Sequence, residues 1–168
     1  MHKPFLPSGE DDLSATFEES YERYFNMVYQ VCFSYLKNAA DAEDAVADVF
    51  EKLIKHGFSL KNAEHEKAWL LRTAINHCKD ILKHWWRMRA NIDDYENLEA
   101  ADLYKGNELM KLILELPDRY KDVVFLYYYE GYSTVEIAKM LRKPKSTIRN
   151  HLHEARGILK GAIEDEEY

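Results

Sequence analysis

Four carboxylates recur at a spacing that could serve catalysis or binding: Asp41, Asp44, Asp48 and Glu51. On a helix they fall within roughly 80° of one another, next to an apolar face. They could hold a metal ion for hydrolysis if His56, His77 or His84 supplied a further ligand or a base. None of these histidines shares the carboxylate face at helical spacing, and the Glu-x-x-His pairing of di-iron bundles is absent.

Other catalytic signatures are also missing from the sequence. It has no Gly-rich phosphate loop, no nucleophile elbow and no Cys-x-x-Cys site. We therefore expect no metal, no cofactor and no enzymatic activity. The acidic face is interpreted as a docking surface for a basic protein partner, or as plain solvated surface.

A second polar set lies in the stretch STVEIAKMLRKPKSTIRNHLHEAR, which begins at Ser133. Ser133 and Glu136 form a capping box, and Pro144 suits the start of another helix, so the stretch predicts two helices joined by a tight turn. In the second helix one arc is apolar and the adjoining arc is cationic and hydrogen-bonding. Such a pair is typical of a helix-turn-helix that enters the major groove, although an ordinary solvated helix would share the spacing. The candidate DNA contacts are Arg142, Lys143, Lys145, Ser146, Thr147, Arg149, Asn150, His153 and Arg156.

A third polar set follows one face of the helix predicted near 67–89. Its cations could lie along a nucleic-acid strand, while Trp85 and Trp86 could stack on an unpaired base. Surface charge beside core tryptophans is the alternative interpretation. Together with the preceding loop, the candidates are Lys61, Asn62, Arg72, Asn76, Lys79, Lys83 and Arg87.

The overall composition is that of a globular protein: 168 residues, 46% hydrophobic, with a net charge of −7. The charge is unevenly distributed, because residues 58–92 and 109–163 are each net positive and an acidic segment separates them. No stretch is long and apolar enough to span a membrane and the amino terminus has no signal-peptide pattern, so we expect a cytoplasmic protein without membrane insertion. Cys32 and Cys78 have the apolar surroundings of buried thiols.

Apolar residues recur at a period of 3.6 along most of the chain, which predicts an all-α protein of two small helical domains joined by an acidic linker. Helices are expected from Thr16 to Lys37, from about 42 to Gly57, near 67–89, 108–115 and 118–130, and over the two helices that follow Ser133. The first helix should bury Phe17, Tyr21, Tyr24, Val28, Val31 and Tyr35, and the second Ala42, Ala45, Val46, Val49, Phe50 and Leu53. The last helix should bury Ile148, Leu152, Ala155 and Leu159. The predicted organisation is a flexible extension (1–13), a helical domain (14–89), a linker (90–106), a helix-turn-helix domain (107–163) and an acidic tail (164–168).

Three segments resemble the extracytoplasmic-function sigma factors, which are small members of the sigma-70 family of RNA polymerase sigma factors. DAEDAVADVFEKLI, from Asp41, resembles the region 2 helix that binds polymerase. AWLLRTAINHCKDILKHWWR, from Ala68, is similar to the family pattern Trp-Leu-x-Arg-x-Ala-x-Asn-x-x-x-Asp. LPDRYKDVVFLYYYEGYSTVEIAKML, from Leu116, resembles the first part of region 4. The three segments occur in the family's order, a far more specific signal than any one alone.

The resemblance implies a function and partners. Core RNA polymerase would bind through its largest-subunit clamp coiled coil and its flap, promoter DNA would be read and melted, and an anti-sigma factor would inhibit. The polymerase-binding residues would be Asp41, Asp44, Asp48, Phe50, Glu51 and Leu53, with Phe50 and Leu53 acting as neighbouring apolar support or as contacts. The third helix and its preceding loop would read the minus-ten element, and the last helix the minus-thirty-five element.

Two points stay open at the sequence level. The family usually has a glycine at the turn between the two reading helices, where this chain has Arg142. A basic side chain there would be tolerated in an ordinary backbone region or would contact a phosphate. A stand-alone helix-turn-helix regulator with an N-terminal helical sensing domain is the alternative function, and it would bind duplex DNA tightly without polymerase.

Overall fold

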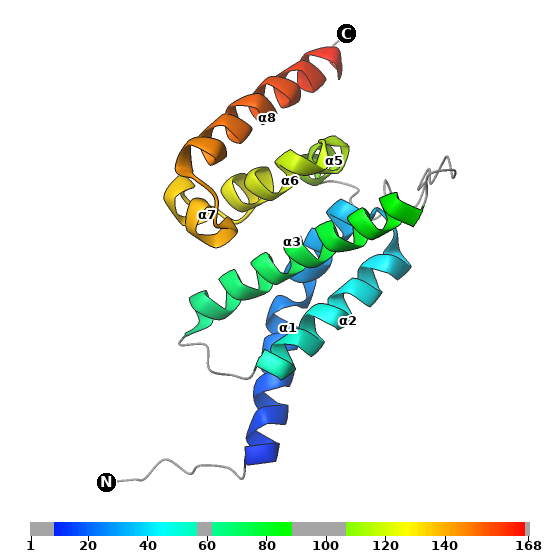
Figure 1. The fold of residues 1–168 in the computed structure, drawn as a ribbon, viewed down its shortest axis with the longest axis vertical. Helices are drawn as coiled ribbons and strands as arrows, with labels where there is room; N and C mark the ends of the chain where they lie inside the picture. Colours follow the sequence, from blue (N-terminus) through cyan, green and yellow to red (C-terminus); the bar gives the residue numbers. More distant parts are fainter. Residues whose placement is uncertain (1–8, 57–61, 89–106, 167–168) are drawn as a thin grey trace.

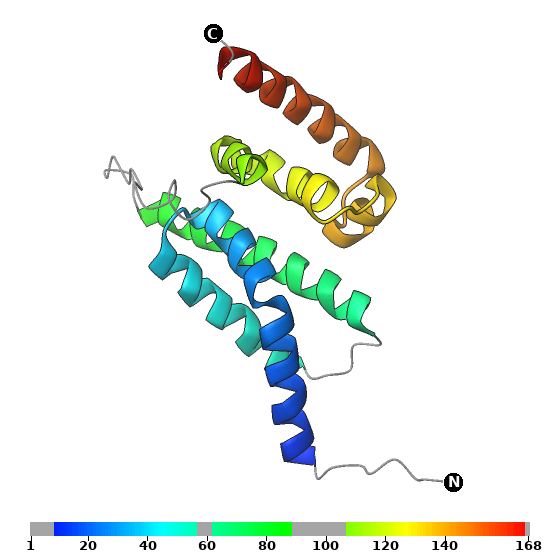
Figure 2. The ribbon, with the colours of Figure 1, turned by 180° about the vertical axis from the view of Figure 1, so that it is seen from behind.

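Two groups of helices pack against each other in the computed structural model, which describes the backbone of residues 9–56, 62–88 and 107–166 and the side chains of 17–56, 62–88 and 107–161 (Figures 1 and 2). The described residues contain helices and no strand, as the hydrophobic period predicts. We call α1, α2 and α3 the first lobe, and the helices from α5 onward the second lobe.

The first lobe consists of α1 (Gly9–Leu36), α2 (Ala39–His56) and α3 (Ala63–Met88). The side-chain oxygen of Asn38 accepts a hydrogen bond from the Asp41 amide at 3.0 Å and so caps the start of α2. The predicted inward face of α2 is confirmed, because all its members are buried: Ala42, Ala45, Val46, Val49, Phe50 and Leu53.

The predicted start of α1 at Thr16 is wrong, because the helix already begins at Gly9, inside the predicted extension. The predicted stripe of α1 is buried at Tyr24, Val28, Val31 and Tyr35, whereas Phe17 is half-buried and Tyr21 exposed. The predicted linker lies outside the described residues.

The second lobe consists of α5 (Glu108–Glu115), α6 (Asp118–Val124), a π-helical turn η1 (Phe125–Tyr129), α7 (Thr134–Leu141) and α8 (Lys145–Glu166). A continuous α-helix over 118–130 was expected, but the last turn of that helix widens. In the turn the Glu130 amide donates to the Phe125 carbonyl at 3.0 Å, and the rings of Phe125 and Tyr129 stack with centroids 5.0 Å apart. Gly131 then ends the helix with a positive φ of 77°, as predicted. α8 continues to Glu166, into the predicted acidic tail.

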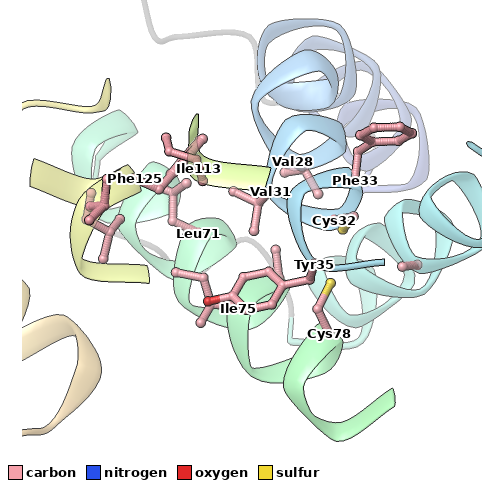
Figure 3. Packing of buried hydrophobic residues seen from close by; sticks show 14 of the residues in the cluster. Val28, Val31, Cys32, Phe33, Tyr35, Leu71, Ile75, Cys78, Ile113 and Phe125 are labelled. Atoms are coloured by element: carbon pink, nitrogen blue, oxygen red, sulfur yellow. The ribbon is translucent and has the colours of Figure 1, made fainter. Parts of the chain in front are cut away.

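One hydrophobic core runs through both lobes. Figure 3 shows Val28 and Val31 of α1 and Leu71 of α3 on one side, with Ile113 of α5 and Phe125 on the other. All five side chains are at most 2% exposed. The second lobe is therefore packed onto α1 and α3 through apolar burial, the main stabilising contribution in folded proteins.

A buried lysine also joins the two lobes. Lys121 of α6 is 1% exposed, and its Nζ donates to the Ser34 carbonyl at 2.7 Å. Ser34 lies in the last turn of α1, where carbonyls have no partner within the helix and a positive charge is favourable. The second lobe thus caps the end of α1.

Candidate functional site

The acidic face of α2 is open to solvent. Asp44, Asp48 and Glu51 are exposed, while Asp41 is half-buried in the first turn. Phe50 and Leu53, which the sequence predicted on the polymerase-binding surface, are 2% and 0% exposed. They pack beneath the acidic face, where Phe50 forms part of the wall of an apolar hollow between α1 and α2.

A histidine of α3 joins the acidic face, contrary to the expectation that no histidine would reach it. His77 Nε2 lies 3.0 Å from Asp48 Oδ2, and its Nδ1 lies 3.1 Å from Lys52 Nζ. Because a lysine ammonium can only donate, Nδ1 accepts and Nε2–H donates to Asp48. The expectation failed because it considered each helix by itself. Among the described residues, no three His, Cys, Asp or Glu side chains are arranged to hold a metal ion.

An apolar hollow of about 420 Å³ lies beside the acidic face, between α1 and α2. Tyr21 is 39% exposed there and lies 4.9 Å from Phe50, measured between ring centroids. Glu43 and Glu51 border the hollow. The sequence assigned Tyr21 to the buried stripe and so did not predict this surface.

The predicted basic face of α3 is divided between two hollows. Arg72 and Asn76 line one of about 260 Å³ together with Lys52 of α2 and Trp69. Trp69 stacks on His56 at a centroid distance of 5.0 Å, which fixes the indole at the rim. Sequence reasoning had treated Trp69 only as part of the family pattern.

The remaining cations of α3 line the second hollow, which faces the second lobe. Lys79, Lys83 and Arg87 all border it. Lys79 Nζ donates to Asp122 Oδ2 of α6 at 2.6 Å, although Asp122 itself is fully buried. Lys143, a predicted contact of the helix-turn-helix, lies 3.8 Å from the same oxygen. One carboxylate of the second lobe thus holds a candidate DNA contact from each lobe.

The loop candidates differ in what the structure describes. Asn62 is exposed, and its Oδ1 accepts from the His65 amide at 2.8 Å at the start of α3. The amide oxygen therefore acts as a helix cap, and its NH₂ group remains exposed for other contacts. Lys61 lies outside the described residues.

The turn between α7 and α8 has the predicted capping box and an unexpected backbone. Ser133 Oγ accepts from the Glu136 amide at 3.2 Å, and Glu136 Oε2 accepts from the Ser133 amide at 2.8 Å. Arg142 is left-handed, with φ 52° and ψ 46°. An ordinary backbone region was one of the two alternatives for this arginine, and that alternative is wrong. Arg142 adopts the conformation that a glycine would adopt without strain.

The polar face of α8 points to solvent. Ile148, Leu152 and Ala155 are buried against the second lobe, as the spacing predicted. The candidate contacts on the opposite side are exposed: Lys145, Ser146, Arg149, Asn150, His153 and Arg156. Thr147 is half-buried.

Arg156 is fixed in place by aromatic side chains. Its Nε donates to the Tyr128 hydroxyl at 2.6 Å, and its guanidinium carbon lies 5.6 Å from the centroid of the Tyr127 ring. The sequence contains a tyrosine run at 127–129 but no spacing that predicts this contact. The arrangement orients one cation at the edge of the exposed face of α8.

Two family profiles match successive parts of the chain. The profile described as "Sigma-70 region 2" covers residues 20–88, and "Sigma-70, region 4" covers residues 106–159. In the part of the chain that the structure describes, no helix has the length and apolarity needed to cross a bilayer.

Several curated proteins are similar over most of the chain. The RNA polymerase sigma factor SigV of Bacillus subtilis (strain 168) is 28% identical over 137 residues, covering 79% of this chain and 81% of that protein. The ECF RNA polymerase sigma factor SigW of the same organism is 26% identical over 178 aligned positions, covering 95% and 94%.

A solved structure shares the fold. It is the sigma factor RpoE in complex with the anti-sigma factor NepR from Bartonella quintana, with a TM-score of 0.65 and 18% identity. The similarity covers 89% of this chain and 97% of the solved one.

Proposed function

The chain belongs to the sigma-70 family, in its extracytoplasmic-function group, and from that premise we propose that it is the promoter-specificity subunit of RNA polymerase. It binds core polymerase and directs promoter recognition, melting and transcription initiation. The observation that carries the proposal is the order of two matched regions, 20–88 and 106–159, in one chain. A stand-alone helix-turn-helix regulator would not explain the match to region 2 over residues 20–88.

The acidic face of α2 docks on polymerase. Asp44, Asp48 and Glu51 present exposed carboxylates to a basic surface such as the clamp coiled coil, with Asp41 at the end of the row. Phe50 and Leu53 support the face from below, since both are buried. The second lobe contacts the flap of polymerase.

Promoter DNA is contacted by both lobes. The loop before α3 and the exposed side of α3 read and melt the minus-ten element through Lys61, Asn62, Arg72, Asn76, Lys79, Lys83 and Arg87. The turn and α8 read the minus-thirty-five element through Arg142, Lys143, Lys145, Ser146, Thr147, Arg149, Asn150, His153 and Arg156. Exposed amide and guanidinium groups such as those of Asn150 and Arg149 suit base edges, and lysines suit phosphates.

The domain assignment follows from these roles. Region 2 occupies 14–89 with α1 extending it to Gly9, the linker 90–106, and region 4 107–163 with α8 continuing to Glu166. The protein acts in the cytoplasm, has no catalytic activity of its own, and is inhibited by an anti-sigma factor.

The test combines the purified chain with core RNA polymerase and genomic DNA fragments. We expect co-elution with core polymerase and transcripts that start at discrete sites, whose alignment gives the two promoter elements. Core polymerase alone is the control. A folded chain that neither co-elutes nor directs discrete starts, yet binds duplex DNA tightly by itself, would replace the proposal with the stand-alone regulator.

A further inference from the structure

A hollow of about 700 Å³ opens between α3 and the second lobe. One wall is the carboxyl-terminal half of α3, and the other is formed by the start of α6 and the turn before α8. The volume is within the range of small-molecule sites, roughly 300 to 1,000 Å³. Because both lobes contribute, the hollow exists only while they are packed together.

The hollow is strongly cationic in a chain whose net charge is −7. Five lysine and arginine side chains line it, against the single carboxylate of Asp118. That carboxylate already accepts from buried Lys121 at 3.1 Å, while Lys79 and Lys143 lie beside buried Asp122. A cleft lined by one sign of charge concentrates counter-ions, so this hollow attracts anions.

Three of the five cations have no carboxylate partner among the described residues. Lys83 and Arg87 are exposed, and within the described part of the chain no hydrogen bond or ion pair engages either one. Arg119, on the opposite wall, is exposed and has no carboxylate partner in the residues that the structure describes. It lies 4.7 Å from the centroid of the Tyr120 ring and hydrogen-bonds the Tyr120 side chain, which leaves its other N–H groups for a ligand. Because these cations lie on both walls of the hollow, they suit a ligand with more than one negative charge.

The same hollow carries a large apolar surface. Trp86 lines it with 85% of its area exposed, next to half-buried Trp85 and Leu82. An indole left in water forgoes the stabilisation that burial would give, and its face can stack on a planar aromatic ring. A ligand that covers this surface therefore has a flat ring as well as negative charges.

We propose that the hollow binds a nucleoside di- or triphosphate, with the base against Trp86 and the phosphates between Lys83, Arg87 and Arg119. Arginine and lysine are the usual phosphate ligands, and base stacking on tryptophan is tolerant of base identity. The inference goes beyond promoter recognition, because Arg119 belongs to neither set of DNA contacts. It is tested on the chain alone, so failure of the sigma assignment would not affect its outcome.

The test titrates the full-length chain with ATP, GTP, inorganic triphosphate and adenosine, and follows tryptophan fluorescence and heat. We expect saturable binding of both nucleotides with a dissociation constant below about 1 mM, and at least about tenfold weaker binding of triphosphate and adenosine. Arg119→Ala should weaken nucleotide binding at least about tenfold through loss of a charged contact. Trp86→Ala should remove the preference for nucleotide over triphosphate.

The control variant is Lys111→Ala, which removes a cation of α5 that does not line the hollow and should leave binding unchanged. Circular dichroism checks the fold, and Lys83→Ala repeats the test on the other wall. The proposal is overturned by absence of saturable binding, by equal affinity for nucleotide and triphosphate, or by equal effects of Arg119→Ala and Lys111→Ala. Binding of a single-stranded oligonucleotide, but not of nucleotides, would instead assign the surface to promoter DNA.

Discussion

Lys121 shows how one residue can make the contact between the lobes depend on pH. Burial lowers the pKa of this lysine to about 8, although the Asp118 carboxylate opposes the shift. An unfolded lysine has a pKa of about 10.4. Between these values the unfolded chain holds a proton that the folded chain has released, so the free energy of unfolding rises with pH. Burial also raises the pKa of Tyr35, so this tyrosine stays protonated over the interval.

We predict that Lys121→Met removes this dependence. Between pH values of about 7.5 and 9.5 the wild-type free energy of unfolding should rise by about 1 to 2 kcal/mol relative to the variant. Urea unfolding of both proteins at the two pH values measures the difference. The same pH dependence in both proteins would mean that Lys121 is not desolvated.

Arg142 combines a strained, left-handed backbone with a proposed contact to DNA. A left-handed backbone conformation costs a non-glycine residue about 1 kcal/mol or more. Glycine avoids this cost, but part of the gain in stability is offset because glycine has more backbone entropy in the unfolded chain. Arg142→Gly should therefore raise the free energy of unfolding by up to about 1 kcal/mol and weaken DNA binding on every promoter sequence. Lys37, with φ 56°, is the matched control: Lys37→Gly should leave DNA affinity unchanged. Unchanged DNA affinity in Arg142→Gly would remove this residue from the interface.

At the scale of elements, α2 is the surface that polymerase should recognise. Replacing Asp44 and Asp48 by lysine should weaken core polymerase binding at least about tenfold through charge repulsion, with helix content preserved. The control makes the same net charge change on α5, at exposed Glu108 and Glu115. Co-elution and fluorescence anisotropy with labelled protein measure the affinity. Equal affinities of the two double variants would contradict the docking assignment.

The exposed face of α8 should distinguish base reading from phosphate binding. If Arg149 reads a base, Arg149→Ala should cost about 1 to 3 kcal/mol at one promoter position; if it holds a phosphate, the loss should be even across sequences. Transcription from a panel of single-position promoter variants separates the two results, with Lys111→Ala as the control. Unaltered transcription on all variants would exclude Arg149 from the interface.

Local signals explain which elements could be predicted. The inward face of α2 and the capping box of α7 follow from spacing and residue type within one helix, and both are confirmed. The π-helical turn at Phe125–Tyr129 carries no such signal, because the apolar spacing over 118–130 is equally that of an ordinary α-helix. The same holds for Lys79 and Asp122, which meet across 43 positions of sequence. Spacing within one helix thus predicts which side chains are buried or capped, but not which side chains meet across helices.

At the scale of the whole molecule, the closed arrangement of the lobes conflicts with simultaneous reading of both promoter elements. The minus-ten and minus-thirty-five elements lie about 25 base pairs apart, which is ~85 Å at 3.4 Å per pair. A compact chain of this length has a radius of gyration of only ~15 Å. The proposed reading of both elements at once would therefore require the lobes to come apart and the shared core to open.

We predict this separation as a fall in energy transfer between dyes on Glu22→Cys of α1 and Gly157→Cys of α8. Both positions are exposed, and the native Cys32 and Cys78 are buried and should not be labelled. Transfer should be high in the free chain and low with core polymerase and promoter DNA. A pair at Glu22 and Lys55, both in the first lobe, is the control. High transfer in a transcribing complex would show that the lobes stay together.

The shared carboxylate of Asp122 has a consequence for the ionic-strength dependence of promoter binding. Salt weakens phosphate contacts in proportion to their number, because it opposes the release of ions condensed on DNA. Lys79 and Lys143 are paired with Asp122. If they contact phosphates as proposed, they must leave this carboxylate, which would then attract cations from solution. Cations that gather at the Asp122 carboxylate when the lobes separate offset part of the cations that DNA releases, so the net number of ions released is smaller. The logarithm of affinity should therefore fall less steeply with the logarithm of salt concentration than the number of neutralised phosphates alone would require.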